Sequence, residues 1–353
     1  MVRPTDQRAE GGSPLTPPTP ASLGFRMPAE WEPHTGTWLT WPRREGISFP
    51  DIFDRIPPVI AAMVRALSEG EGVFINVWDA AMEAEARAVL AEHGALNDRV
   101  EFFHHRAYEP WCRDHGPVFV KNETTRAVVN WDYNAWGEKY PPFDLDNQIP
   151  AHIAAARGLE CFTPEMVLEG GSIEVNGAGT LLTTESCLLN PNRNPNLTRE
   201  QIEQRLRDNL GITEIIWLGE GIAGDDTDGH IDDLTRFVDE QTVVTAIEKN
   251  PEDENHAPLQ ANLERLRQTN LRIIELPMPP PVIFQNERLP ASYANFSIGN
   301  KVVLLPTFRH PNDAHAQAIL QDCFPTRKVI PLDATNLIWG LGAFHCLTQQ
   351  EPR

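Results

Sequence analysis

The chain has 353 residues, of which 41% are hydrophobic, and this length is enough for one large domain or two ordinary ones. It carries 50 acidic and 30 basic side chains, so its formal net charge is −20. Such a surface repels nucleic acid and anionic membranes, and it favours a small cationic substrate over a nucleotide or a phosphate ester. No apolar run reaches the length of a membrane span, so we expect neither nucleic acid nor a membrane as a partner.

The N-terminal segment is rich in Pro, Ser and Thr and has no apolar core of a signal peptide. We therefore expect residues 1–23 to form a disordered N-terminal extension and residues 24–353 to form a single folded domain. The five cysteines are widely spaced and include no CxxC pair, which argues against a disulfide framework and a zinc site. These features predict a cytoplasmic protein with reduced thiols. They leave its oligomeric state open, a homodimer included.

Apolar spacing predicts a helix at 52–67 and five further amphipathic helices. The third of the five has the capping-box pattern Thr198-Arg199-Glu200-Gln201 ahead of apolar side chains at four-residue spacing. The five helices are expected to begin near Ala80, Asp144, Thr198, His256 and Asn312. Short β-rich runs lie between them, at 100–103, 118–121, 127–131, 180–184, 215–218, 242–246, 273–276 and 302–305.

The helix starts are 54 to 64 residues apart, which indicates a repeating unit of one helix and about three strands. A unit of this length favours an α/β fold with a radial or stacked arrangement. The alternative is an ordinary α/β domain whose helices are evenly spaced by chance.

Four polar, loop-like segments stand out, around Asp114, Glu169, His230 and Cys346. Successive members of this set are 55, 61 and 116 residues apart, so each falls at about the same place in its repeating unit. One unit has no reactive side chain at this place, which falls near Arg288. If the units surround an axis, equivalent positions converge on it and the four side chains share one pocket. The alternative is a coincidence among loop residues.

A thiol, an imidazole and several carboxylates in one pocket suit an attack on a planar cationic group. Cys346 is the candidate nucleophile, because a thiolate needs a depressed pKa or a nearby base. His230 can transfer protons near neutral pH, and Glu169 can fix the orientation of its ring. Asp114 and Asp232 match the fork of N–H donors that a guanidinium presents.

The same residues allow other interpretations. Cys346 could be a buried cysteine that acts as a small hydrophobe. His345 is a second candidate base, but adjacent side chains point apart on a strand or a helix, so we prefer His230. The aspartates at 225–233 could bind Ca²⁺ or Mg²⁺, yet no frame supplies the glutamate that an EF-hand loop needs at its twelfth position.

Several segments resemble the agmatine deiminases and the related bacterial-type peptidylarginine deiminases. The resemblance extends from about Met27 to Gln350, and it departs from the family pattern at Asp233, where many members have Asn. Many members also have three consecutive glycines where this chain has the run at 340–343. The segments that carry the resemblance are WCRDHGP at 111–117, LEGGSIEVNGAGTLLTTESCLLNPNRNP at 168–195, GDDTDGHIDDLTRF at 224–237, LPASYANF at 289–296 and GLGAFHCLTQQ at 340–350.

The resemblance implies a pentein fold, a five-bladed α/β propeller with pseudo-five-fold symmetry and a central active site. It implies hydrolysis of agmatine to N-carbamoylputrescine and ammonia through a covalent cysteine–amidino intermediate, a step in putrescine and polyamine biosynthesis. No metal and no organic cofactor is implied. By this likeness Cys346 is the nucleophile and His230 the general acid and base. Glu169 orients the histidine, while Asp114 and Asp232 bind the guanidinium.

The sequence indicates less directly which residues bind the part of the substrate beyond its guanidinium group. Trp111, Trp136 and Tyr293 are candidate walls for the methylene tail and its ammonium, with ordinary aromatic packing as the alternative. Arg288 lies at the predicted level of the pocket. The net charge favours doubly cationic agmatine, with peptidyl arginine second and free arginine third. An amidinotransferase and a catalytically silent guanidinium-binding module stay open as alternatives.

Overall fold

The computed structural model describes residues 18–353. The extension expected at residues 1–23 therefore lies mostly outside the described residues. Its last part forms the short 3-10 turn η1 (Ala21–Leu23). Within residues 18–353, no helix is both long and apolar enough to cross a membrane.

In the described part of the chain, the strands form five small mixed sheets and one separate hairpin. The first sheet has the order β18-β1-β2-β3, with strands at Gln349–Pro352, His34–Thr40, Gly72–Asn76 and Val100–Phe103. Four sheets have three strands each: β4-β5-β6 (Val118–Lys121, Arg126–Val129, Glu160–Phe162), β7-β8-β9 (Glu174–Val175, Thr180–Thr184, Glu214–Leu218), β10-β11-β12 (Thr235–Asp239, Thr242–Ile247, Arg272–Pro277) and β15-β16-β17 (Ser297–Ile298, Val302–Thr307, Lys328–Asp333). The hairpin pairs β13 (Val282–Phe284) with β14 (Glu287–Leu289).

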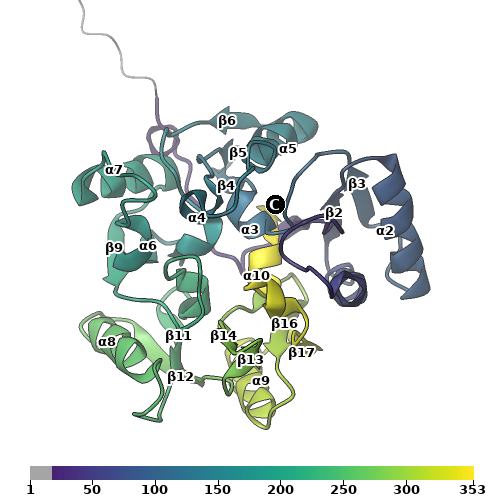
Figure 1. Ribbon diagram of the computed structural model, residues 1–353. Helices are drawn as coiled ribbons and strands as arrows, with labels where there is room; N and C mark the ends of the chain where they lie inside the picture. The colour runs from purple at the N-terminus through teal and green to yellow at the C-terminus, as the bar shows by residue number, and fades with distance from the viewer. Residues whose placement is uncertain (1–17) are drawn as a thin grey trace, which may run out of the picture.

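The four three-stranded sheets share one pattern of connections. The first two strands of each are antiparallel, the last two are parallel, and a helix connects the parallel pair, as a parallel connection requires. Figure 1 shows these helices on the outside of the molecule and α10 near its middle. The connecting helices are α5 (Ile149–Arg157), α7 (Arg199–Leu210), α8 (His256–Leu266) and α9 (Asn312–Cys323). The expected unit of one helix and about three strands is thus confirmed for these four sheets, whereas the first sheet has four strands.

The predicted helices lie close to their expected places. α2 (Ala80–Glu92), α8 and α9 begin at the predicted residues, and Thr198 caps α7 in a complete capping box with Gln201. The helix predicted at Asp144 begins later, because a 3-10 turn, η3 (Asp146–Gln148), precedes α5. The helix predicted at 52–67 is divided in the same way, into η2 (Phe53–Arg55) and α1 (Ile56–Leu67).

The last strand of the chain closes the first sheet. β18 pairs antiparallel with β1, with Gln349 opposite Trp38 and Gln350 opposite Thr37. The carboxylate of Glu351 in β18 is fully buried and accepts a hydrogen bond of 2.9 Å from Trp38 Nε1. It also accepts one of 2.8 Å from Arg126 Nη1. These contacts hold the end of the chain, which would fray without them.

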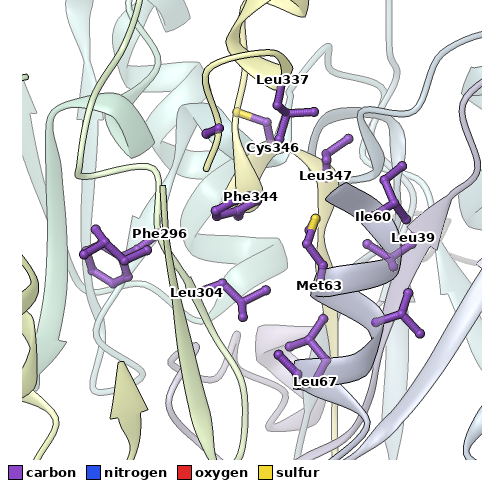
Figure 2. Close-up of a cluster of buried hydrophobic side chains, with 14 of the residues drawn as sticks. Leu39, Ile60, Met63, Leu67, Phe296, Leu304, Leu337, Phe344, Cys346 and Leu347 are labelled. Carbon is purple, nitrogen blue, oxygen red and sulfur yellow. The ribbon is translucent and has the colours of Figure 1, made fainter. Parts of the chain in front are cut away.

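The largest hydrophobic core packs against the short helix α10 (Phe344–Leu347) that precedes β18. Phe344 and Leu347 are at most 1% exposed, and burying each stabilises the fold by about 1.5–3 kcal/mol. Figure 2 shows Phe344 within this cluster, with Met63 of α1 and Phe296 on either side in this view. Cys346 lies at the edge of the cluster, so the core fixes the position of its backbone.

Candidate active site

Short helical turns, each directly before the first strand of a sheet, carry the candidate residues. Asp114 lies before β4 and Glu169 before β7, while His230 and Asp232 lie before β10 and Cys346 before β18. Since these strands occupy equivalent places in their sheets, the turns meet at one place in the molecule. The turns are α3 (Cys112–His115), η4 (Gly170–Ser172), η5 (Ile231–Asp233) and α10.

Gly171 marks the point where three of these side chains meet. A Cβ atom on Gly171 would lie 2.7 Å from Asp114 Oδ1, 2.7 Å from His230 Nδ1 and 3.1 Å from Asp232 Oδ2. Any side chain here would displace the polar groups, so the Glu-Gly-Gly sequence needs glycine at this position. The structure thus brings together residues that are more than 50 positions apart in the sequence.

Asp114 is held in place by two donors. Gly171 N donates to Oδ1 at 3.0 Å, and Trp136 Nε1 donates to Oδ2 at 2.9 Å. Burial raises the pKa of Asp114 to about 6, with Asp232 adding to the rise and His230 opposing it. Trp136 lies in a left-handed turn, where it and Ala135 have φ of 56° and 52°. Backbone strain of this kind collects at functional sites, and here it directs the indole N–H at a carboxylate.

His230 is fully buried between carboxylates. Oδ1 of Asp114 lies 3.7 Å from its Nδ1, and neither ring nitrogen has a hydrogen-bond partner among the residues that the structure describes. Burial alone would lower the pKa of His230, but Asp114 first, and then Cys187 and Glu169, raise this pKa well above its usual range. An imidazolium is therefore the favoured form of His230 near neutral pH.

Glu169 is fixed by an arginine that the sequence analysis did not single out. Arg193 Nε donates to Oε1 of Glu169 at 2.6 Å, and both side chains are fully buried. The other oxygen of Glu169 has no partner within residues 18–353. A carboxylate oxygen of Glu169, the sulfur of Cys187 and a ring nitrogen of His230 all lie within 4.8 Å of one another. The predicted proximity of Glu169 to His230 is therefore present.

Asp232 lies between Cys346 and the neighbouring histidine. Its Oδ2 accepts a hydrogen bond of 2.7 Å from His345 Nδ1 and lies 3.6 Å from Cys346 Sγ, while Oδ1 has no partner in the described part of the chain. Burial would raise the pKa of Asp232, but the hydrogen bond and charge of His345 outweigh it and lower this pKa. The Cys346 thiol has a pKa well above its usual range, because of burial first and then of Asp232.

A cavity of about 100 Å³ opens beside Cys346. Four sequence-predicted residues line it: Trp111, Asp114, Trp136 and Cys346. The walls that the sequence analysis did not identify include Ile47, Tyr140, Asp226, Trp339 and Leu341. Among these, Asp226 belongs to the aspartate-rich segment before His230, and Leu341 belongs to the motif at 340–350. The other three had no signal in the sequence. Among residues 18–353, no lysine or arginine lines the cavity.

Two predicted substrate-binding residues lie elsewhere. Tyr293 is fully buried, and its hydroxyl donates to Asp313 Oδ1 at 2.6 Å. Arg288 belongs to β14, where its Nη1 donates to Asp253 at 2.8 Å and to Glu254 at 3.1 Å. Neither lines the cavity. The vacant position expected near Arg288 is also misplaced, because the turn equivalent to the others, directly before β15, lies at 292–295.

Within residues 18–353, two groups of buried residues could offer metal ligands, yet an arginine already neutralises each. Arg193 pairs with Glu169 in the first group, which also holds Cys187 and His230. Arg236 pairs with both carboxylates of the second group, which consists of Glu30, Glu174 and His345. A metal ion would have to compete with these guanidinium groups, so the donor sets fit a cation poorly.

The aspartates before His230 support the backbone of the site. Asp225 Oδ2 accepts a hydrogen bond from His230 N at 3.2 Å, and Oδ1 accepts one from Thr227 N at 2.8 Å. Asp228 pairs with Arg193 at 2.6 Å and with Lys139 at 2.9 Å. These carboxylates are engaged in local contacts, which disfavours the metal-binding interpretation of the segment.

Comparison with known proteins places these observations in a family. Residues 26–352 match the Porphyromonas-type peptidyl-arginine deiminase family. The chain belongs to this family. An agmatine deiminase of Ectopseudomonas mendocina is 38% identical, and the match covers 95% of this chain and 97% of the relative.

Solved structures agree with this membership. The agmatine deiminase of Enterococcus faecalis superimposes with a TM-score of 0.90 at 30% identity, covering 96% of this chain and 99% of its own. A C. jejuni agmatine deiminase with a cysteine-to-serine substitution and bound substrate gives 0.87 at 31% identity, covering 93% and 96%. A DDAH from Pseudomonas aeruginosa gives 0.50 at 14% identity and shows the fold alone. The family member described here thus has the expected pentein-like fold.

Proposed function

We propose that this protein is an agmatine deiminase, which hydrolyses agmatine to N-carbamoylputrescine and ammonia. The observation that carries the proposal is the meeting of Asp114, His230 and Asp232 around Gly171. Asp232 Oδ2 lies 3.6 Å from Cys346 Sγ, and Asp114 and Cys346 line one cavity. A thiol, an imidazole and two carboxylates at these distances suit the binding and cleavage of a guanidinium. The identity to curated agmatine deiminases over nearly the whole chain supports it.

We further propose that the five sheets are blades of a propeller with approximate five-fold symmetry, around a central active site. The common order of strands in four sheets supports this arrangement. So does the placement of candidate residues in turns before the first strands. A propeller explains how widely separated motifs come to share one pocket, because equivalent ends of its blades face the same axis.

Binding of the guanidinium falls to Asp114 and Asp232. Both carboxylates are at least 96% buried, and an ionised carboxylate without a partner is costly at such a place. A guanidinium offers each of them a positive charge and N–H donors in a plane, in addition to the hydrogen bonds that they already accept. The free Oδ1 of Asp232 is available for this contact. The same cation lies beside Cys346, so it offsets the negative charges that disfavour the thiolate.

The reaction then proceeds in two halves. Once the cation is bound, the Cys346 thiol loses its proton to solvent and its thiolate Sγ adds to the central carbon. The bond from this carbon to the departing nitrogen breaks as His230 gives that nitrogen a proton. Ammonia leaves, and an amidino group remains on sulfur. Water attacks the same carbon while His230 takes its proton, and the carbon–sulfur bond breaks to release the ureido product. The raised pKa of His230 fits its first role, because the ring is protonated before the leaving group departs.

The charges of the cavity favour agmatine over arginine. Asp226 lines the cavity, and its nearest cation, Lys139, lies 3.2 Å away and also pairs with Asp228. The distal ammonium of agmatine would be attracted by this acidic wall. The carboxylate of arginine would meet it without a lining lysine or arginine, among the described residues, to bind it.

The experiment follows ammonia and ureido product with agmatine, arginine and an N-acyl arginine amide as separate substrates. We expect the kcat/KM for agmatine to exceed the others by at least about a hundredfold, since an unpaired buried charge costs several kcal/mol. Cys346→Ser should abolish turnover, whereas Cys161→Ser, at an exposed thiol, should not. Preference for the arginine amide would favour a peptidylarginine deiminase instead, and no product from any substrate would favour a binding module.

A further inference from the structure

The turn at 292–295 occupies the fifth position of the repeat, directly before β15, and it places Asn295 beside the candidate nucleophile. Asn295 is 1% exposed. Its side-chain oxygen accepts hydrogen bonds from the backbone N of His345 at 3.1 Å and of Cys346 at 3.3 Å. Its Nδ2 donates to Asp233 Oδ1 and to Cys346 Sγ, each at 3.0 Å. All four hydrogen bonds of the Asn295 side-chain amide are thus made with Cys346, with the adjacent His345 or with Asp233.

The orientation of this amide follows from its partners. Two backbone N–H groups can only donate, so they must face the oxygen of Asn295. The NH₂ group then faces the carboxylate and the sulfur. Asp233 is itself fixed, since Ser292 Oγ donates to its backbone oxygen at 2.7 Å. The N–H directed at Cys346 Sγ is therefore built into the fold.

We propose that Asn295 is the positioning residue of the nucleophile, holding the first turn of α10 through its oxygen and stabilising the thiolate of Cys346 through its N–H. The catalytic part of this inference rests on the proposed function. The contacts themselves do not, because a thiolate can be detected without any substrate.

The surroundings of Cys346 explain why such a donor is needed. Asp232 and Asp233 of η5 and Asp114 of α3 all disfavour a negative sulfur, and Asn295 is the group that opposes them. Within residues 18–353, its Nδ2 is the one N–H that donates to Sγ. His345 does not share this task, because its Nδ1 is directed at Asp232.

The decisive variant is Asn295→Asp, which keeps an acceptor for the two backbone N–H groups and removes the donor to sulfur. We expect the pH midpoint for alkylation of Cys346 by iodoacetamide to rise by about one to two units, because a hydrogen bond to a charged group is lost. With agmatine, kcat near neutral pH should fall about 10- to 100-fold, KM should change less than about threefold, and kcat should recover as the pH is raised.

The matched control is the double variant Asp233→Asn with Asn295→Asp, which exchanges donor and acceptor. It restores the contact between the two side chains and leaves net charge unchanged, but no donor faces the sulfur. We expect its alkylation midpoint to stay raised. Full recovery of the wild-type midpoint and of kcat in the double variant would overturn the proposal and assign Asn295 a packing role alone.

Two further arms keep the test decisive. If Asn295→Asp fails to fold, Asn295→Ser gives the same alkylation readout with a smaller side chain, and an unchanged midpoint in a folded variant overturns the proposal. If the wild-type protein does not turn over agmatine, the proposed function fails. The alkylation midpoints of wild type and Asn295→Asp still decide the role of Asn295.

Discussion

His345 binds Asp232 rather than turning toward the adjacent Cys346: its Nδ1 lies 2.7 Å from Asp232 Oδ2. On the far side of the ring, Nε2 lies 3.3 Å from Glu30 Oε2, and Glu30 pairs with the buried Arg236. A chain of buried polar groups thus extends from the candidate guanidinium site into the interior. It assigns His345 to the support of a carboxylate.

This contact predicts the effect of His345→Gln. Loss of the imidazole removes the group that lowers the pKa of Asp232, so this pKa should rise. Asp232 binds a cation only when ionised, and its ionised form is lost as the pH falls through its pKa. We expect kcat/KM for agmatine to fall about tenfold at neutral pH, with part of the loss recovered at higher pH. A pH profile parallel to that of the wild type would contradict this role.

Asp114 sets a second pH dependence. With a pKa of about 6, raised by burial, it is protonated below that pH and then offers no charge to the guanidinium. We predict that kcat/KM for agmatine declines as the pH falls through about 6. In the complex the cation favours the ionised carboxylate, so the decline in kcat should occur at a lower pH. Coincident midpoints for the two parameters would argue against Asp114 as a substrate ligand.

Gly171→Ala tests the packing at the centre of the site. The added Cβ would lie 2.7 Å from both Asp114 Oδ1 and His230 Nδ1, so at least one of these groups must move. Displacement of a reacting group by about 1 Å costs about a hundredfold in rate, and we expect a loss of at least that size in kcat. Gly94→Ala is the control.

Gly94 has φ of 62° and open space around its Cβ position. Its substitution should lower the free energy of unfolding by about 1 kcal/mol, measured by urea denaturation, and leave kcat unchanged. Equal losses of activity in both variants would mean that Gly171 matters only for stability.

Asp226→Asn tests substrate selection at the wall of the cavity. Removal of this charge should lower kcat/KM for agmatine about tenfold. It should not lower kcat/KM for arginine, whose carboxylate the charge repels, so the preference for agmatine narrows. The comparison is the ratio of the two kcat/KM values. Asp322→Asn, at an exposed position on α9, changes the net charge equally and should leave the ratio as it is. A similar change of ratio in both variants would point to the overall charge of the protein instead.

Local signals made much of the fold predictable. The amphipathic spacing of α2, α7, α8 and α9 is encoded within each helix, and side chains cap the starts of α2 and α7. The starts of these four helices were located to within a residue. Strand β10 was missed because its polar sequence contains Arg236, which resembles a surface residue. The partners that bury Arg236, Glu30 and Glu174, lie far away in the sequence and give no local signal.

The site residues that the repeat places in equivalent turns could be predicted from the sequence. Contacts that the repeat does not determine could not. Asp114, His230 and Cys346 occupy equivalent turns, so their periodic spacing indicated a shared pocket. The direction of Tyr293 was not determined by its place in such a turn, and its hydroxyl instead binds Asp313 of α9. Asn295 was missed because an amide carries no reactive signature in a sequence. Only the contact with Cys346 shows its place in the site.

The most direct measurement of the central claim is mass spectrometry of the protein quenched with acid during turnover of agmatine. We predict that the peptide containing Cys346 gains the mass of agmatine less ammonia, and that Cys346→Ser shows neither this adduct nor turnover. Undiminished turnover in Cys346→Ser, with no adduct on the wild-type peptide, would contradict the assignment of Cys346 as the nucleophile.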